Sequence, residues 1–390
     1  MAEAYIVAAT RTAGGRKGGR MRGWHPADLA GSVLDELIVR TGIDPAVVED
    51  VIMGCVTQAG EQSTNIARNA VLASKLPESV PGTSVDRQCG SSQQALQFAA
   101  QAVMSGTMDV VIASGVESMT RAPMGMSVML PAKAGMGVPK SPRMEDRYPN
   151  IQFSQFAGAE MVAAKYGLTK EQLDEYGYHS HQRAIAATQA GAFRDEILAL
   201  DGMDAEGNAV RHDSDEGIRY DVSLDGMRGV KLLQEGGRIT AATSSQICDG
   251  ASGVMVVSER ALKEHNLTPM ARVHHLSLLG HDPVIMLEAP IPATERALKR
   301  AGMSIDDIDL FEVNEAFASV PVAFIQKLGA DHAKVNVNGG AIALGHPLGA
   351  SGTKLMTTLL YALQARGKKY GLQTMCEGGG LANVTIVERL

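Results

Sequence analysis

Apolar and polar positions over roughly the first hundred residues change repeatedly between a strand pattern and a helix pattern. Short apolar runs predict buried strands, whereas apolar positions at helical spacing predict helices. Strands are predicted at 6–10, 50–56, 84–86 and 109–114, and helices at 26–39 and 91–104. Because strands that alternate with helices build parallel sheets with both faces covered, we expect a mostly parallel α/β sheet.

The C-terminal part of the chain repeats this alternation. Its strands are predicted at 271–279, 309–313, 334–337, 371–375 and 383–388, and its helices at 292–301 and 352–363. A stretch that begins at Gly42 also parallels one that begins at Gly302, more in the order of elements than in identity. We therefore interpret the chain as a duplicated α/β unit.

The middle of the chain has a different pattern. Residues 119–150 are rich in Met, Pro, Gly and basic residues and predict a functional loop without regular structure. Helices are predicted at 159–166 and 170–189. We expect a loop domain at 119–248, inserted into an N-terminal half made of 1–118 and 249–268 and followed by a C-terminal half at 269–390.

Composition narrows the classes of protein. The net charge of −7 over 390 residues and the 4% aromatic content disfavour a nucleic-acid partner. The densest basic run, from Arg11 to Arg22, is read as a solvated loop. No apolar run is long enough to span a bilayer, and a strand from Ile6 leaves no room for a targeting segment. We expect a cytoplasmic protein with no membrane span and with reduced cysteines.

Cys89 is the first residue that could carry chemistry. It lies where an extended segment ends and a helix begins, in Asp86-Arg-Gln-Cys-Gly-Ser-Ser. The helix dipole and the free backbone N–H groups there would lower the thiol pKa and could stabilise an oxyanion. The alternative is that Cys89 fills space in the core, as most free cysteines do.

His346 lies in a glycine-dense turn, Gly339-Gly-Ala-Ile-Ala-Leu-Gly-His-Pro-Leu-Gly, ahead of a predicted helix. Its imidazole could take a proton from a thiol. Two alternatives remain for the turn, a purely structural histidine or a phosphate-binding loop, although the P-loop pattern is absent. None of the cysteines is spaced with a histidine as in a zinc site, so we expect no metal.

Two further candidates follow strands. Cys376 opens Cys-Glu-Gly-Gly-Gly, where glycines would let a ligand approach the backbone closely. Asn314 opens Asn-Glu-Ala-Phe, and its amide could position a water molecule. A buried strand-end cysteine and a turn-capping asparagine are the structural alternatives.

Together these motifs resemble the thiolase family over essentially the whole chain. The resemblance rests on Cys89 in its turn, Asn314-Glu-Ala-Phe, Gly345-His-Pro-Leu-Gly and Cys376-Glu-Gly-Gly-Gly in the family's order and spacing, and on the opening Ala9-Thr-Arg-Thr-Ala-Gly-Gly. It implies the thiolase fold, with duplicated βαβαβαββ halves in a five-layered α/β/α/β/α arrangement and an inserted loop domain over the CoA site.

The resemblance also implies ping-pong acyl transfer with CoA as co-substrate and no tightly bound cofactor. His346 would deprotonate Cys89, and Cys376 would exchange protons with the leaving enolate and with incoming CoA. Asn314 would hold a water in one oxyanion site, and the N–H groups of Cys89 and Gly378 would form another. The resemblance further implies that Ser245 contacts the pantetheine arm of CoA and Arg219 its nucleotide. A homodimer or homotetramer is expected.

Departures from the biosynthetic pattern point to the degradative branch. Ser154 and Gln155 stand where many biosynthetic enzymes carry His-Met, and Ser244-Ser-Gln replaces Ala-Ser-Gly. The stretches around Cys89 and Cys376 look most like actinobacterial thiolases of steroid breakdown. The alternatives are a biosynthetic acetoacetyl-CoA thiolase, a decarboxylating ketosynthase, which Cys376 argues against, and a non-catalytic thiolase-like lipid carrier.

Overall fold

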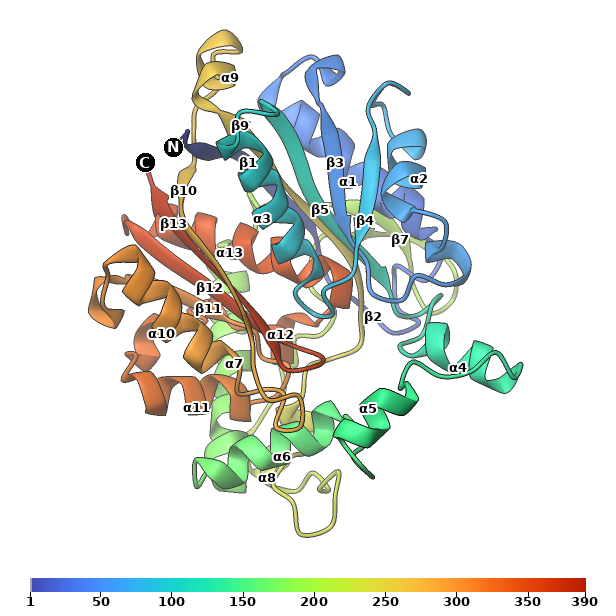
Figure 1. Ribbon diagram of the computed structural model, residues 1–390, viewed down its shortest axis with the longest axis vertical. Helices are drawn as coiled ribbons and strands as arrows, with labels where there is room; N and C mark the ends of the chain where they lie inside the picture. The colour runs from blue at the N-terminus through green and yellow to red at the C-terminus, as the bar shows by residue number, and fades with distance from the viewer. Residues whose placement is uncertain (1) are drawn as a thin grey trace.

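A continuous mixed β-sheet organises the computed structural model, which describes residues 2–390 (Figure 1). Strands β1 (Ala4–Thr12) and β10 (Ala271–Gly280) join its two halves through a short antiparallel contact, in which Tyr5 pairs with Arg272. The strand order is β11-β12-β13-β10-β1-β9-β5-β3-β4, with short β2 (Gly15–Arg16) and β6 (Ile197–Leu198) off this path. The N-terminal half therefore meets the C-terminal half at β1 and β10.

Each half combines parallel and antiparallel pairs. In the N-terminal half, β3 (Asp50–Gly54) runs parallel to β4 (Gly82–Val85) and β5 (Val110–Ser118), while β9 (Cys248–Ser258) is antiparallel to β5 and β1. In the C-terminal half, β11 (Leu310–Val313) is parallel to β12 (Tyr370–Glu377), and β13 (Leu381–Arg389) is antiparallel to β12 and β10. The prediction of a mostly parallel sheet is therefore wrong. A three-glycine turn joins β12 to β13, and so short a link permits only antiparallel pairing.

Helices form three layers around the two halves of the sheet (Figure 1). Helices α3 (Ser91–Met104) and α13 (Ser351–Ala365) pack between the halves and approach closely, since a Cβ on Gly352 would lie 2.0 Å from the backbone N of Gln93. Outside the N-terminal half lie α1 (Pro26–Thr41) and α2 (Ile66–Ala73), and outside the C-terminal half lie α10 (Pro290–Ala301) and α11 (Ser319–Leu328). Three separate hydrophobic clusters fill the spaces between these layers.

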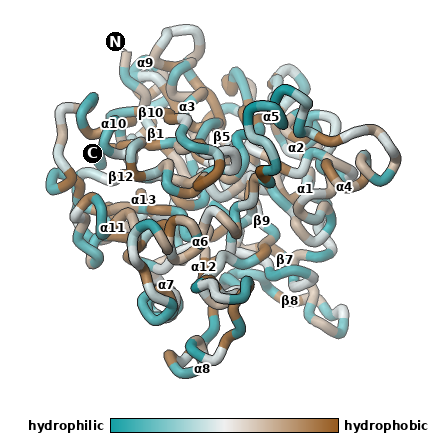
Figure 2. The backbone as a smooth tube through the Cα atoms, turned by 60° about the horizontal axis from the view of Figure 1, so that its bottom comes forward, coloured by the Kyte–Doolittle hydropathy of each residue, from teal (hydrophilic) through white to brown (hydrophobic). Residues whose placement is uncertain are grey.

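The segment between β5 and β9 holds most of the remaining elements. Its helices are α4 (Met126–Lys133), α5 (Pro142–Arg147), α6 (Gln155–Lys165), α7 (Lys170–Gln189) and α8 (Leu224–Arg228), and β7 (Leu200–Met203) pairs with β8 (Ala209–His212). Helices α6 and α7 confirm the helices predicted at 159–166 and 170–189. Figure 2 shows hydrophilic stretches over α5 and α7 and hydrophobic stretches at α8.

Residues 119–150 contain regular structure, contrary to the prediction. Helix α5 begins at Pro142 because Ser141 caps it and proline suits the first helical position. Helix α4 begins after Gly125, which has a positive φ of 83°. Methionine, proline and glycine therefore mark the ends of short helices in this segment.

The predicted strand at 334–337 is also wrong. Only single bridges form there, from Val335 to Phe311 and from Val337 to Gly339. Asn336 interrupts the segment with a φ of 48°, and its amide donates to the side chains of Tyr176 and Glu315. Periodicity also did not reveal helices α2, α8 and α11, or the short helices α9 (Glu259–Glu264) and α12 (Ala341–Leu344). Among residues 2–390, no helix is both long and apolar enough to cross a membrane.

Candidate active site

Cys89 lies in a strained turn between β4 and α3. Gln88 before it has a φ of 49°, a conformation that costs free energy in a residue with a side chain. Ser91 holds the turn closed, because its Oγ accepts from the N–H of Arg87 at 2.9 Å and donates to the carbonyl of Gln88 at 2.5 Å. The turn places Cys89, with 8% of its surface exposed, at the N-terminus of α3.

Burial dominates the electrostatics of the Cys89 thiol. It raises the thiol pKa to about 12, and the nearby carboxyl of Glu377 acts in the same direction, while the backbone N–H of Cys89 acts against both. The sequence led us to expect a lowered pKa, which is wrong for this structure. The reason is the apolar cluster around the thiol, made by Met119, Leu348, Leu355 and Met375. A thiol in such surroundings needs a base before it can act as a nucleophile.

His346 is held as a neutral base by its neighbours. Ser351 Oγ donates to the carbonyl of Pro347 at 2.9 Å and lies 2.5 Å from Nδ1 of His346, so it accepts the Nδ1 proton. Nε2 then carries the lone pair, and Nδ2 of Asn314 donates to it at 3.4 Å. Burial, and then the charge of Lys354, lower the pKa of His346 to about 3. The imidazole is therefore uncharged at neutral pH and able to take a proton.

Asn314 follows β11 and points an amide toward His346. Its backbone N–H donates to the carbonyl of Thr374 at 3.1 Å, which ties the residue to β12. Its Oδ1 is buried without a hydrogen-bond partner among residues 2–390. An unpaired buried acceptor is costly and is a place where a small polar group can bind.

Glu315 anchors the turn that carries Asn314. Its carboxyl accepts from the hydroxyls of Tyr176 at 3.1 Å and Ser180 at 2.7 Å, and from the N–H of Ile342 at 3.1 Å. These partners come from α7 and α12, so one buried carboxyl joins the inserted segment to the turn before His346. The sequence contained this residue in the motif Asn314-Glu-Ala-Phe, but nothing in its pattern showed which groups it would bind.

Cys376 lies at the end of β12 with 1% of its surface exposed. Burial raises its pKa well above the ordinary value, and the Cys89 thiol is the next largest cause. Gly378 adjoins the same turn, since a Cβ there would lie 3.0 Å from Oε1 of Gln88. The C-terminal half thus brings Cys376 and Gly378 to the turn of Cys89 in the N-terminal half.

Glu377 is a buried residue beside both thiols that sequence reasoning missed. A Cβ on Gly90 would lie 2.0 Å from its Oε1, so glycine is needed for the carboxyl to fit against the start of α3. Burial raises the pKa of Glu377 to about 8, although Arg87 and the N–H of Asn383 act in the opposite direction. The only sequence signal was its place between Cys376 and three glycines.

A cavity of about 230 Å³ opens beside His346. Ser245 lies in its wall, and the other lining residues are mostly apolar, including Met119, Met124, Phe156, Leu233, Ile247, Phe317 and Leu348, with Gln155 as a polar exception. Of the methionines in 119–150, buried Met119 and partly exposed Met124 line this cavity, whereas Met129, Met136 and Met144 are exposed and do not line it. The cavity can take an apolar group that ends near the imidazole.

Arg219 lies in a neighbouring cavity of about 200 Å³, between α7 and α8. His181 also lines it, and Nδ1 of His181 accepts from the backbone N–H of Arg219 at 3.2 Å. Ala241 lines the cavity beside His346 and Ala242 lines the one beside Arg219, so the two cavities flank one short segment. Among residues 2–390, no group of histidine, cysteine and carboxylate side chains is arranged to hold a metal ion.

Comparison with known families agrees with this geometry. Residues 4–260 match the model of the thiolase N-terminal domain, and residues 267–389 match that of the thiolase C-terminal domain. The chain is 53% identical to the steroid 3-ketoacyl-CoA thiolase FadA6 of Mycobacterium tuberculosis, over 100% of this chain and 95% of that protein. It is 43% identical to a 3-ketoacyl-CoA thiolase of Yersinia pestis, over the full length of both.

Solved structures give the same result. The Bacillus anthracis acetyl-CoA acetyltransferase has a TM-score of 0.91 and 33% identity, over 100% of this chain and 99% of that chain. The human mitochondrial 3-ketoacyl-CoA thiolase has a TM-score of 0.90, also with 33% identity and the same coverage. This likeness confirms the predicted fold, with its two α/β halves and five layers.

Proposed function

The chain belongs to the thiolase family and is an acyltransferase, and we propose that it cleaves a 3-oxoacyl-CoA with a second molecule of CoA. The observation that carries this proposal is the meeting of two thiols from opposite halves. Cys376 lies close enough to Cys89 for the two thiols to affect each other's charge, and the neutral imidazole of His346 lies on the loop whose Leu348 packs in one cluster with Cys89. Two thiols and a base are what two successive acyl transfers require.

The first half-reaction begins with proton transfer from Cys89 to Nε2 of His346. The thiolate attacks C3 of the substrate, and the bond between C2 and C3 breaks with its electron pair on the departing two-carbon or three-carbon thioester. Cys376 protonates that enolate, which leaves as acetyl-CoA or propionyl-CoA. A thiol with a raised pKa stays protonated until a strong base such as an enolate reaches it.

In the second half-reaction, Cys376, now a thiolate, takes the proton of incoming CoA. The CoA sulfur attacks the acyl group on Cys89, and the thiolate of Cys89 leaves and recovers its proton. The products are a shortened acyl-CoA and the resting enzyme. CoA is therefore a co-substrate, and no step in this scheme uses a metal ion or a tightly bound cofactor.

Two oxyanion sites would support these steps. The backbone N–H groups of Cys89 and Gly378 would bind the oxyanion formed at C3, at the N-terminus of α3. The side chains of His346 and Asn314, the latter through a water, would bind the enolate oxygen. Ser245 would contact the pantetheine arm, and Arg219 the nucleotide of CoA, in the two cavities that flank Ala241 and Ala242.

We assign the enzyme to degradation, with a bulky or medium-chain acyl group in the apolar cavity beside His346. The names of its relatives support this assignment, because FadA6 is named a steroid 3-ketoacyl-CoA thiolase and the Yersinia protein a 3-ketoacyl-CoA thiolase. No feature of the site favours the biosynthetic direction or a non-catalytic lipid carrier.

The inserted segment 119–248 would act as the loop domain over CoA, between the N-terminal half (1–118 and 249–268) and the C-terminal half (269–390). We also expect a two-fold oligomer in the cytoplasm. Strand β4 is the end strand of the sheet, and a free strand edge next to the Cys89 turn is suited to pair with a second copy.

Acyl transfer to Cys89 can be tested by mass spectrometry. The enzyme is mixed with a 3-oxoacyl-CoA in the absence of CoA, digested and analysed for acylated peptides. We expect the acyl mass on the peptide that contains Cys89, its loss in Cys89→Ala, and its removal when CoA is added. An adduct on Cys376 alone would overturn the assignment of the nucleophile.

A further inference from the structure

Lys354 is a buried cation that the scheme above leaves without a role. It lies on the first turn of α13 with 5% of its surface exposed. Among residues 2–390, no carboxylate oxygen lies within 4.0 Å of Nζ of Lys354, so the lysine forms no ion pair there. Lysine ammonium groups are strongly hydrated, so burial without a contacting carboxylate is costly and needs other compensation.

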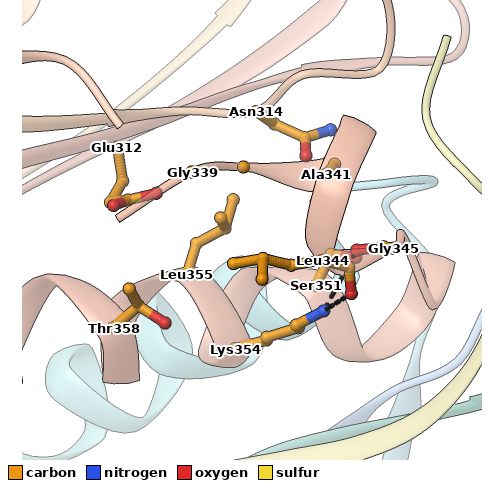
Figure 3. Close-up of a pocket in the computed structure, with 11 residues that line it drawn as sticks. Glu312, Asn314, Gly339, Ala341, Leu344, Gly345, Ser351, Lys354, Leu355 and Thr358 are labelled. Atoms are coloured by element: carbon orange, nitrogen blue, oxygen red, sulfur yellow. Dashed lines mark hydrogen bonds between the residues drawn. The ribbon is translucent and has the colours of Figure 1, made fainter. Parts of the chain in front are cut away.

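Two backbone carbonyls supply that compensation. Nζ of Lys354 donates to the carbonyl of Leu344 at 2.5 Å and to that of Gly345 at 3.1 Å (Figure 3). These residues end the short helix α12, whose last carbonyls have no partner within the helix. A cation is also the charge that the negative end of a helix favours.

The bound carbonyls belong to the two residues directly before His346. Gly345 has a φ of 80°, and a Cβ there would lie 2.6 Å from Sγ of Cys248, so the backbone has no room to shift on that side. Ser351 and Lys354 lie three residues apart and therefore on the same face of α13. One side chain holds the imidazole of His346, and the other holds the peptide groups that lead into it.

We propose that Lys354 is the positioning residue of the catalytic base, which fixes the turn from Leu344 to His346 and keeps the imidazole aimed at the thiol of Cys89. This inference rests on the proposed function for the role of His346. The charge adds a second effect, because Lys354 is the charged group that most strongly disfavours protonation of His346. Holding the base in place and holding it neutral are thus properties of one side chain.

Charges behind Lys354 complete the arrangement. Burial lowers the pKa of Lys354, and Arg11 acts in the same direction. Cys248, Asp215 and Glu196 act in the opposite direction and favour the charged form. Arg11 itself pairs with Glu196 at 2.6 Å and with Asp215 at 2.8 Å, all fully buried. The two carboxylates come from the inserted segment, so the cation that holds the base is balanced by residues outside the half that carries it.

The test compares Lys354→Met, which removes donor and charge, with Lys354→Gln, which keeps a donor without charge, and Lys354→Arg, which keeps both. Single-turnover acylation of Cys89 should slow by roughly 10- to 100-fold in Lys354→Met with little change in KM, the scale of a misplaced catalytic group. Lys354→Arg should recover most of the rate. Lys263→Met, at a lysine on the exposed side of α9, is the matched control and should leave the rate unchanged.

The pH profile separates positioning from mere support of the fold. Without the cation, the imidazole protonates more easily, so the acid limb of acylation should move to higher pH in Lys354→Gln and Lys354→Met but not in Lys354→Arg. The proposal would be overturned if Lys354→Gln folded and had the same acylation rate and the same acid limb of the pH profile as the wild type. Lys354→Gln provides this test even if Lys354→Met fails to fold.

Alkylation of Cys89 by iodoacetamide gives the same comparison without substrate. It should slow in Lys354→Met, and also in His346→Ala, which removes the base. If the wild-type enzyme failed to cleave any 3-oxoacyl-CoA, slower alkylation would still support the link from Lys354 to Cys89. Equal alkylation in all variants would refute that link, whatever the reaction proved to be.

Discussion

The hydroxyl of Ser351 lies 2.5 Å from Nδ1 of His346 and donates its own proton to the carbonyl of Pro347. Only the tautomer with a proton on Nδ1 satisfies both contacts. Ser351 thereby places the lone pair of His346 on Nε2, the nitrogen that can then accept a proton. It sits five residues beyond His346, at the start of the next helix.

Replacing Ser351 tests this arrangement. Ser351→Ala should lower kcat/KM by roughly 10-fold, because one buried hydrogen bond of about 1 kcal/mol, and with it the preference between tautomers, is lost. Ser351→Thr keeps the hydroxyl and is the control. The measurement is steady-state thiolysis with a thermal melting curve for each variant. Equal kcat/KM in Ser351→Ala and wild type would show that the hydroxyl does not set the state of His346.

Cys376→Ser should separate binding from proton transfer. A hydroxyl is a much weaker acid than a thiol, so it should donate poorly to the enolate and accept poorly from CoA. We expect kcat to fall by about two to four orders of magnitude, the usual contribution of acid–base catalysis, with KM little changed. Normal turnover combined with a lower melting temperature would instead assign Cys376 a purely structural role.

Glu377→Gln should change the pH dependence of stability. The pKa of this buried carboxyl is raised to about 8, so the folded state is penalised progressively as pH rises from the unfolded value near 4.5 to 8. Each pKa unit corresponds to about 1.4 kcal/mol, which makes the loss a few kcal/mol in wild type and absent in the variant.

Urea unfolding of both proteins at pH 5, 7 and 9 measures this difference. The gap in unfolding free energy should widen toward pH 9 in favour of Glu377→Gln. Alkylation of Cys89 should also be faster in the variant at pH 9, because the carboxylate that raises the thiol pKa is gone. An equal difference in unfolding free energy between the two proteins at all three pH values would contradict the raised pKa of Glu377.

Met124→Ala tests the acyl cavity, with Met136→Ala as the matched control. Met124 lines the cavity beside His346, whereas Met136 is 80% exposed. A panel from acetoacetyl-CoA to sterol-derived 3-oxoacyl-CoAs should show higher kcat/KM for bulky acyl groups in wild type. Met124→Ala should lower that kcat/KM by roughly 5- to 10-fold, the scale of one partly buried methionine, and spare acetoacetyl-CoA. Acetoacetyl-CoA as the best wild-type substrate would refute the assignment to bulky substrates.

Local patterns in the sequence predicted the elements that carry the site. Helix α3 begins and ends where its spacing indicated, and α7 does too. The pairing of strands was not accessible in this way. The alternation of strand and helix patterns along the chain cannot reveal that β9 lies antiparallel between β1 and β5. That pairing depends on contacts between residues far apart in the chain. Asn336 broke a predicted strand through hydrogen bonds to Tyr176 and Glu315, which are also distant in sequence.

The electrostatics of the site was the least predictable part. A helix N-terminus suggested a low thiol pKa for Cys89, but the leucines and methionines around it come from four other segments and reverse the direction. Lys354 and Glu377 have roles that depend on which backbone groups reach them across the core. Hydrophobic periodicity indicates which face of a helix is buried, but it does not indicate which residues that face contacts.

The division of the reactive groups between two halves has a consequence for biosynthesis. Cys89 lies in the first quarter of the chain, whereas Asn314, His346 and Cys376 all lie in the last. A ribosome adds about 5–20 residues per second, so the proposed nucleophile exists for on the order of tens of seconds before its proposed base is made. Throughout that interval the nascent chain carries a thiol with no partner to ionise it. Acyl-CoA in the surrounding solution therefore meets a competent enzyme only after the complete polypeptide has closed around β1 and β10.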